Sequence, residues 1–187
     1  NNSAVENIHS TASEASIYIH DTKVNETTVE ANSLDFSYHN VTCPKTTIKS
    51  NKGNVYLGES SGDVDLSGDS VSLTLSLPLK GNISANLERG DISGGFDSYP
   101  TDTYIKGSVE TGNGDIFGKS SYGEKNATYT WDLKTTLGNI SLSNYNDWEE
   151  TNDEEDTDEM PEEMENMDGM DHMNSITDDT SEESTIE

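Results

Sequence analysis

Residues 81–92 read Gly-Asn-Ile-Ser-Ala-Asn-Leu-Glu-Arg-Gly-Asp-Ile. Two short turns, each a glycine followed by Asn or Asp, enclose a segment in which apolar and polar residues alternate. Glycine adopts positive φ without a Cβ penalty, and Asn or Asp tolerates the left-handed region and can bond its own backbone. Alternation with a period of two is typical of a strand with one buried face. The stretch therefore predicts a β-strand bounded by two sharp turns.

The same turn, Gly-Asp/Asn-Ile/Val, recurs along the chain. Its glycines and the residues that follow them are Gly53, Asn54, Gly62, Asp63, Gly81, Asn82, Gly90, Asp91, Gly114, Asp115, Gly138 and Asn139. The glycines at 53 and 62 recur 28 residues later at 81 and 90, and those at 90, 114 and 138 are 24 residues apart. A repeat of this length indicates a solenoid, in which each coil buries its apolar face against its neighbours.

Residues 1–146 are therefore expected to form an all-β domain, a parallel β-solenoid of short coils in the manner of a β-helix or β-roll. A β-sandwich with tight hairpins is the alternative, because a two-residue turn also joins antiparallel strands. The turn residues are interpreted as structural. Calcium binding is not expected at them, because the tandem nine-residue spacing of calcium-binding rolls is not sustained and Asn replaces Asp at 54, 82 and 139.

Charge is concentrated at the end of the chain. The formal net charge is −27, and residues 147–187 hold 19 of the 37 acidic residues and no Lys or Arg. Such a segment cannot bury enough apolar surface to fold, so a disordered acidic tail is predicted over 147–187. The field repels phosphate backbones, which argues against nucleic-acid binding. Cationic peptides, basic protein surfaces or other envelope components are the expected partners.

The tail also holds all five methionines of the chain, at 160, 164, 167, 170 and 173. Thioether and imidazole groups suit Cu(I), so Met164, Met167, Met170, His172 and Met173 are candidate copper ligands. This run resembles the Met-rich segments of bacterial extracytoplasmic copper-handling proteins. Two alternatives remain open: a solvated tail without a specific ligand, and a transient helix from Pro161 that presents its methionines to a partner.

The sequence offers little for catalysis. The four histidines, at 9, 20, 39 and 172, are scattered, and no nucleophile elbow, His-Glu-x-x-His motif or phosphate-cradling loop is present. Cys43 is the single cysteine, which excludes an internal disulfide. No apolar run approaches the roughly 20 residues that span a bilayer. We expect a non-enzymatic protein without a resident cofactor, processed or excised from an extracytoplasmic precursor, with any membrane association through a segment absent here.

Three stretches carry a resemblance to a known family. They are the opening strand at 15–19, the run Val71–Leu79 that leads into Gly81-Asn82-Ile83, and the closing segment Leu133–Leu142. With the repeated turns, they make residues 8–145 resemble a bacterial family of adhesin-type domains of unknown function, related to the head-GIN type. The resemblance implies a parallel β-solenoid, no known catalytic residues, and a role in the bacterial cell envelope or at the cell surface, such as adhesion or the envelope-stress response.

Overall fold

The computed structural model describes residues 3–148. The elements are β1 (Ser3–Lys80), β2 (Ile83–Arg89), β3 (Ile92–Phe96), β4 (Thr103–Thr111), β5 (Gly114–Ile116), β6 (Ser121–Tyr122), β7 (Tyr129–Leu137), β8 (Ile140–Asn144) and the short 3-10 helix η1 (Tyr145–Trp148). All pairings between the named strands are parallel except that of β4 with β6. The predicted all-β parallel solenoid is confirmed, and the sandwich alternative is wrong.

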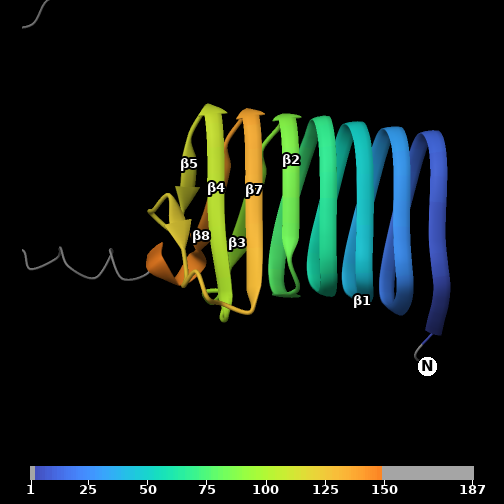
Figure 1. Ribbon diagram of the computed structural model, residues 1–187, viewed down its shortest axis with the longest axis horizontal. Coiled ribbons are helices and arrows are strands. Elements are labelled where there is room, and N and C mark those ends of the chain that lie inside the picture. Colours follow the sequence, from blue (N-terminus) through green and yellow to red (C-terminus); the bar gives the residue numbers. More distant parts are fainter. Residues whose placement is uncertain (1–2, 149–187) are drawn as a thin grey trace, which may run out of the picture. The chain divides into compact units, whose positions relative to one another are not determined.

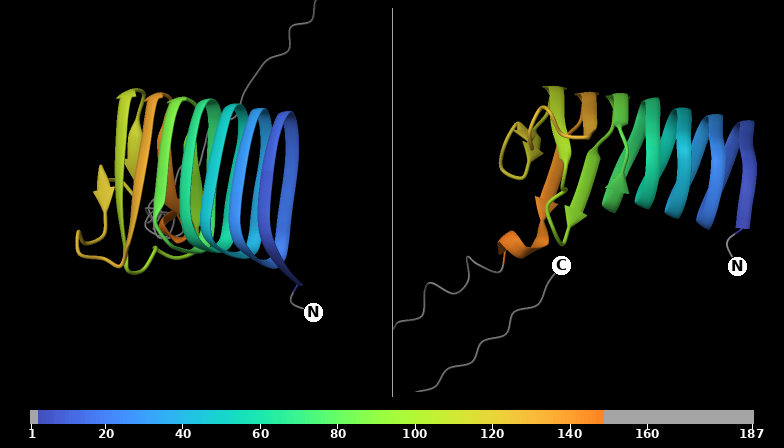
Figure 2. Two further views of the ribbon diagram at one scale, coloured as in Figure 1. Left: turned by 45° about the vertical axis from the view of Figure 1, so that its right-hand side comes forward. Right: turned by 60° about the horizontal axis from the view of Figure 1, so that its bottom comes forward.

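The coils stack side by side along one axis, with β1 winding through several of them as an uninterrupted 78-residue strand (Figures 1 and 2). Val64 pairs with Ile83, and Leu73 pairs with Ile92. The turn residues Asp63 and Asn82 bond to each other across the same step, with a sequence separation of 19. One coil therefore takes 19 residues in this part of the stack.

The repeat lengths expected from the glycine spacing are therefore wrong. Each coil turns at two edges, and glycines occur at both. Gly81 stacks on Gly62, one coil earlier, and Gly53 stacks on Leu34 in a separate column. The step from Gly53 to Gly81 links turns from two different columns, so it does not measure the height of a coil.

The last coils do not stack in the order of the sequence. β7 lies between β2 and β4, and β8 lies between β3 and β5. In Figure 1 the orange β7 is flanked by the two green strands β2 and β4. Ile83 accordingly pairs with Trp131, far beyond the next coil in the sequence, and Thr103 pairs with Tyr129. After β3 the chain crosses over through residues 97–102, passes the position of one coil, and later fills it with β7 and β8.

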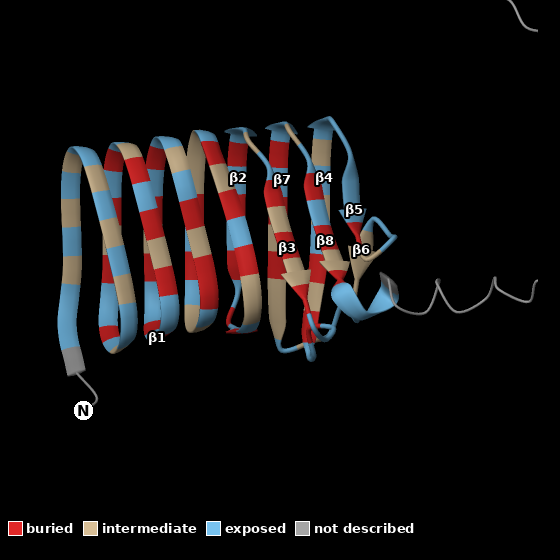
Figure 3. Ribbon diagram, turned by 180° about the vertical axis from the view of Figure 1, so that it is seen from behind, coloured by how far each residue is buried: buried red, intermediate tan, exposed pale blue. Residues whose placement is uncertain are grey.

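Apolar side chains of successive coils form the core. β2 alternates buried and exposed residues over its first five positions, and Leu66, Ala85 and Leu133 lie in register on three neighbouring coils. All three are buried. Burial of a leucine side chain contributes about 1.5–3 kcal/mol, so each inner column is a substantial source of stability. Figure 3 shows the buried positions as stripes across the coils, while the first coil is mostly exposed or half-buried.

A small polar cluster lies inside this core. The Tyr38 hydroxyl donates to Thr27 Oγ1 at 2.6 Å, and Thr46 Oγ1 donates to the Tyr38 oxygen at 3.3 Å. The Cys43 thiol lies 3.6 Å from Thr27 Oγ1. Burial raises the pKa of Tyr38 strongly. The hydrogen bonds offset the cost of burying these groups, so the cluster is a structural part of the core.

The predicted domain boundary at 146/147 falls inside η1. Of the predicted tail, Asp147 and Trp148 belong to this helix, and residues 149–187 lie outside the described part of the chain. The helices found within residues 3–148 offer no candidate for a membrane-spanning segment.

Candidate functional site

The predicted turn residues lie at the edges of the coils. Gly53, Gly62, Gly81, Gly90 and Gly138 all have positive φ. The turn expected at Gly114 needs a correction: the positive φ belongs to Gly112, whose added Cβ would overlap the carbonyl of Gly138. Gly114 instead begins β5 and has room for a side chain. The sequence motif identified the turn, but the glycine that approaches a neighbouring coil lies two residues earlier.

The Asn and Asp residues of the turns bond to one another between coils. The side-chain amide of Asn54 donates to Asp35 Oδ1 at 3.0 Å, and that of Asn82 donates to Asp63 Oδ1 at 3.0 Å. Asn139 donates to Asp91 Oδ1 at 3.1 Å from its amide and at 2.8 Å from its backbone N–H. We call these pairs the Asp–Asn ladder; it places an amide donor, instead of a second carboxylate, against each of these carboxylates.

Replacing Asn82 with aspartate tests the ladder. The new carboxylate would face Asp63 and remove an amide donor, so we expect the melting temperature at neutral pH to fall by about 2–5 °C. In this variant, repulsion between the new carboxylate and Asp63 raises the folded-state pKa of the two groups. The loss of stability is therefore present above that pKa, and it is relieved as the pH falls through it. Thermal melts followed by circular dichroism at pH 7 and pH 3 measure both effects.

The matched control is Asn86→Asp, which adds the same charge four residues further along the chain, within β2. Asn86 pairs in register with Lys134 and Ser67, so the new carboxylate faces a base and a hydroxyl. We expect its melting temperature to change little at either pH. Equal losses for both variants would show that the ladder does not discriminate amide from carboxylate.

The metal hypotheses concern different parts of the chain. Across residues 3–148, no group of three or more His, Cys, Asp or Glu side chains is arranged to hold a metal ion. His20 lies 3.4 Å from Asp21, and His39 lies 4.0 Å from Glu59. The candidate copper ligands Met164, Met167, Met170, His172 and Met173 lie outside the described residues.

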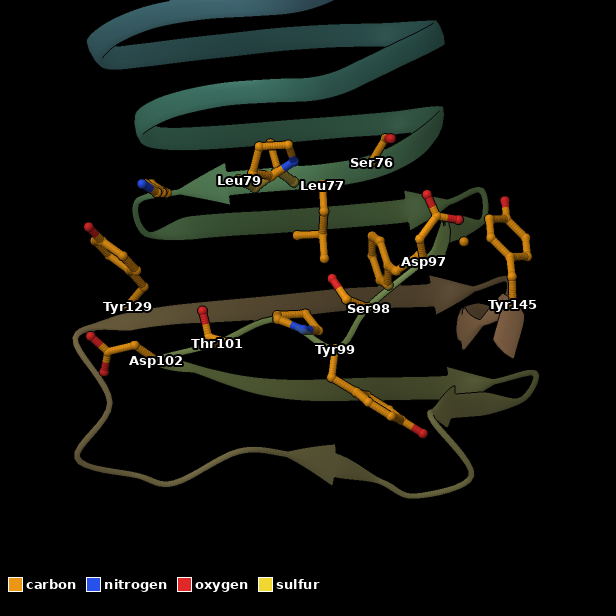
Figure 4. A pocket seen from close by; sticks show the side chains of 15 residues that line it. Ser76, Leu77, Leu79, Asp97, Ser98, Tyr99, Thr101, Asp102, Tyr129 and Tyr145 are labelled. Atoms are coloured by element: carbon orange, nitrogen blue, oxygen red, sulfur yellow. The ribbon is translucent and has the colours of Figure 1, made fainter. Parts of the chain in front are cut away.

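A groove of about 690 Å³ opens where the stacking order changes (Figure 4). We call it the crossover groove. It lies between the end of β1 and residues 97–102 of the crossover segment. The end of β3 contributes two lining residues, and β7 and η1 contribute one each. Its lining residues are Ser76, Leu77, Pro78, Leu79, Lys80, Gly95, Phe96, Asp97, Ser98, Tyr99, Pro100, Thr101, Asp102, Tyr129 and Tyr145. The groove exists because the crossover runs past a coil instead of joining neighbouring turns.

Aromatic packing fixes the crossover segment. The ring of Tyr99 stacks on Tyr122 with centroids 5.4 Å apart and lies edge-on to Phe117 at 5.0 Å. Its hydroxyl donates to Asp147 Oδ2 at 2.6 Å. Phe117 also contacts Phe96, which lies against the buried Trp131. The groove is thus connected by stacked rings to the core of the inserted coil.

Two carboxylates lie in the groove. Asp102 has φ of 54° and accepts a hydrogen bond from the Thr128 N–H at 2.9 Å. Hydrogen bonds from the side chain and backbone of Thr128 lower the pKa of Asp102, so it is ionised at neutral pH. Asp97 is positioned through its backbone carbonyl, which accepts from the Asn146 amide at 2.8 Å. Figure 4 shows Asp102 beside Tyr129 at one end and Asp97 beside Tyr145 at the other.

The sequence interpretation did not single out these residues. Two signals were present: the alternation of apolar and polar residues stops at residues 97–102, and five of the eight tyrosines follow residue 96. Neither signal alone indicates a groove. Tyr129 and Asp102 come together only because β7 inserts between β2 and β4.

Comparison with known proteins addresses the whole solenoid. The model of the family described as Toastrack DUF4097 matches residues 1–163, which include every coil described above. The searches of curated proteins and of solved structures found no match. The family match agrees with the expectation of an uncharacterised, solenoid-forming bacterial domain. Because it covers most of the sequence, the chain belongs to the Toastrack DUF4097 family, a family of unknown function.

Proposed function

We propose that this chain is a non-enzymatic binding and scaffold domain of the bacterial cell envelope, located outside the cytoplasm, and that its partner is a cationic peptide or protein surface. The observation that carries the proposal is the excess of 37 acidic over 10 basic residues. An acidic surface of this size attracts cationic partners over a distance set by the ionic strength.

The arrangement of the basic residues supports this proposal. Arg89 bonds to Asp69 at 2.7 Å, while Lys106 and Lys134 lie 2.9 and 3.3 Å from Asp132 Oδ2. Burial opposes ionisation of Asp132, but the two lysines outweigh it and lower the pKa of that carboxyl. These three basic residues form ion pairs with carboxylates of the solenoid itself. The acidic residues that have no such basic neighbour are then available to attract a cationic partner.

Removing residues 149–187 tests the electrostatic part of the proposal. The cut retains Asp147 and its bond to Tyr99, so the crossover groove keeps its supports. We expect the affinity for a labelled oligolysine peptide to fall by about tenfold at low salt, because most of the negative charge is lost. Fluorescence anisotropy measures the affinity.

The control keeps the tail but replaces its Asp and Glu residues with Asn and Gln. It should bind as weakly as the truncated chain, and added salt should remove the difference from the native chain. Unchanged affinity after truncation would reject the tail as the source of attraction.

The role in adhesion or in the envelope-stress response, and the extracytoplasmic location, rest on the family resemblance of residues 8–145. Surface labelling of intact cells with a membrane-impermeant reagent tests the location. Protection of the chain in intact cells, together with labelling after lysis, would contradict it.

A second candidate function is copper sequestration by Met164, Met167, Met170, His172 and Met173. It is favoured by the placement of every methionine within residues 160–173. Cu(I) titration of the full chain under reducing conditions, with a variant carrying leucine at the five methionines as control, tests it. Equal affinities for the two proteins would exclude the methionines as ligands.

A further inference from the structure

We infer that the crossover groove is a binding site for an extended peptide with two cationic side chains, one at each end of the groove, separated by apolar side chains. The inference rests on the proposed function, because it names the site that recognises a cationic partner. A groove of this kind selects peptides by the spacing of their cationic side chains, which general attraction to an acidic surface does not do.

The two ends of the groove have the same chemistry. Each pairs a carboxylate with a tyrosine, Asp102 with Tyr129 and Asp97 with Tyr145 (Figure 4). A guanidinium group can bond to a carboxylate while its flat face lies on an aromatic ring, so both interactions favour arginine. Lys80 is the one basic residue of the lining.

Apolar residues contribute to the lining between the charged ends. Figure 4 shows Leu77 between these ends, beside the hydroxyl of Ser98, and Pro78 is an exposed apolar residue of the same lining. Leu77 is only partly buried although it packs against the core. An extended peptide directs alternate side chains to one side, so it can place apolar groups here and charged groups at both ends.

The site is built before any ligand arrives. Thr128 holds the Asp102 carboxylate, and Asn146 holds the backbone of Asp97. The Tyr145 ring lies so close to Gly95 that a Cβ there would overlap it, although 57% of Tyr145 remains exposed. Little side-chain freedom is lost when a ligand binds to groups already fixed in place, so the interactions contribute more fully to affinity.

Charge also selects the occupant. Residues 149–187 carry 18 acidic residues and no Lys or Arg, so Asp97 and Asp102 repel them. A neutral glycan could stack on the tyrosines, but it would leave both carboxylates without a compensating charge. A cationic peptide satisfies the aromatic and the charged groups together.

The experiment measures binding of the labelled peptide Arg-Ser-Leu-Ser-Arg to the full chain, because its two arginines and the leucine between them occupy alternate positions and so face the same side of an extended chain. The paired probe has citrulline in place of arginine, which preserves the shape and removes the charge. The groove variant is Asp97→Asn with Asp102→Asn, because Asn tolerates positive φ and keeps an acceptor for Thr128. Its matched control is Asp65→Asn with Glu110→Gln, two exposed acids away from the groove.

We expect the groove variant to bind the arginine peptide about tenfold more weakly than the control variant, and the citrulline peptide to bind both equally weakly. Tyr145→Leu should also weaken binding. Equal affinities of the two double variants would overturn the groove site. The proposed function would still stand if truncation at 149 weakened oligolysine binding. Tighter groove-dependent binding after truncation would assign the groove to the chain's own tail and overturn the inference.

Discussion

Replacing Gly90 with alanine is expected to destabilise the solenoid by more than about 3 kcal/mol. Gly90 has φ of 128°, and an added Cβ would overlap the carbonyl oxygen of Val71 on the preceding coil. Its N–H donates to Leu137 at 3.0 Å, and its carbonyl accepts from Thr135 at 2.9 Å on the following coil. The backbone cannot move away without breaking contacts on both sides. Urea denaturation followed by circular dichroism measures the loss.

Two causes contribute to the expected loss at Gly90, the positive-φ backbone conformation and the close approach of the neighbouring coil. The variant Gly118→Ala separates them. Gly118 also has positive φ, at 75°, but nothing lies within 4 Å of its added Cβ. The variant should lose only about 1–2 kcal/mol, the cost of the left-handed backbone for alanine. Similar losses for both glycine variants would mean that the backbone conformation, and not the distance between coils, sets the requirement for glycine.

Replacing Trp131 with alanine is expected to cost about 3–5 kcal/mol, the range for removing a large buried aromatic side chain. Trp131 has no exposed surface, and its Nε1 donates to the Gly81 carbonyl at 3.2 Å. It pairs in register with Ile83 on one side and Ile105 on the other. The substitution therefore leaves a cavity within the coil that lies between β2 and β4.

Two further variants serve as controls for the Trp131→Ala prediction. Trp131→Phe retains most of the apolar volume but loses the hydrogen bond, so we expect a smaller loss of about 1–3 kcal/mol. Tyr18→Ala, on the first coil, should change stability by less than about 0.5 kcal/mol because 68% of Tyr18 is exposed. A loss below about 1 kcal/mol for Trp131→Ala would contradict the insertion of β7 between its neighbours.

The solenoid could be predicted because its determinants are local. Alternation in β2 specifies which side chains face inward, and a glycine next to Asn or Asp specifies a turn wherever it occurs. The height of a coil was predicted wrongly, because glycines mark both edges and their spacing alone does not say which two share a column. Gly62 and Gly81 lie in the same column, as their contact shows. The sequence motif is the same at Gly53, so the sequence alone does not show that Gly81 stacks on Gly62 and not on Gly53.

The crossover groove could not be predicted for a related reason. Asp102, Tyr129 and Tyr145 are far apart in the sequence and lie around one groove only after β7 has taken its place. The order of the last coils depends on which strand fits best beside β2. Trp131 and Leu133 provide large buried side chains there, and the hydroxyl of Thr135 bonds to Gly90. Such complementarity is a property of packed surfaces.

The sequence by itself determined the strands, the turns, the all-β solenoid and the concentration of acidic residues and methionines near its end, since each depends on neighbouring residues or on composition. Only the tertiary structure decided the height of a coil, the insertion of β7 and β8, the Asp–Asn ladder and the crossover groove. These features depend on contacts between residues 19 to 48 positions apart. Which distant residues meet is set by the packing of whole coils against one another.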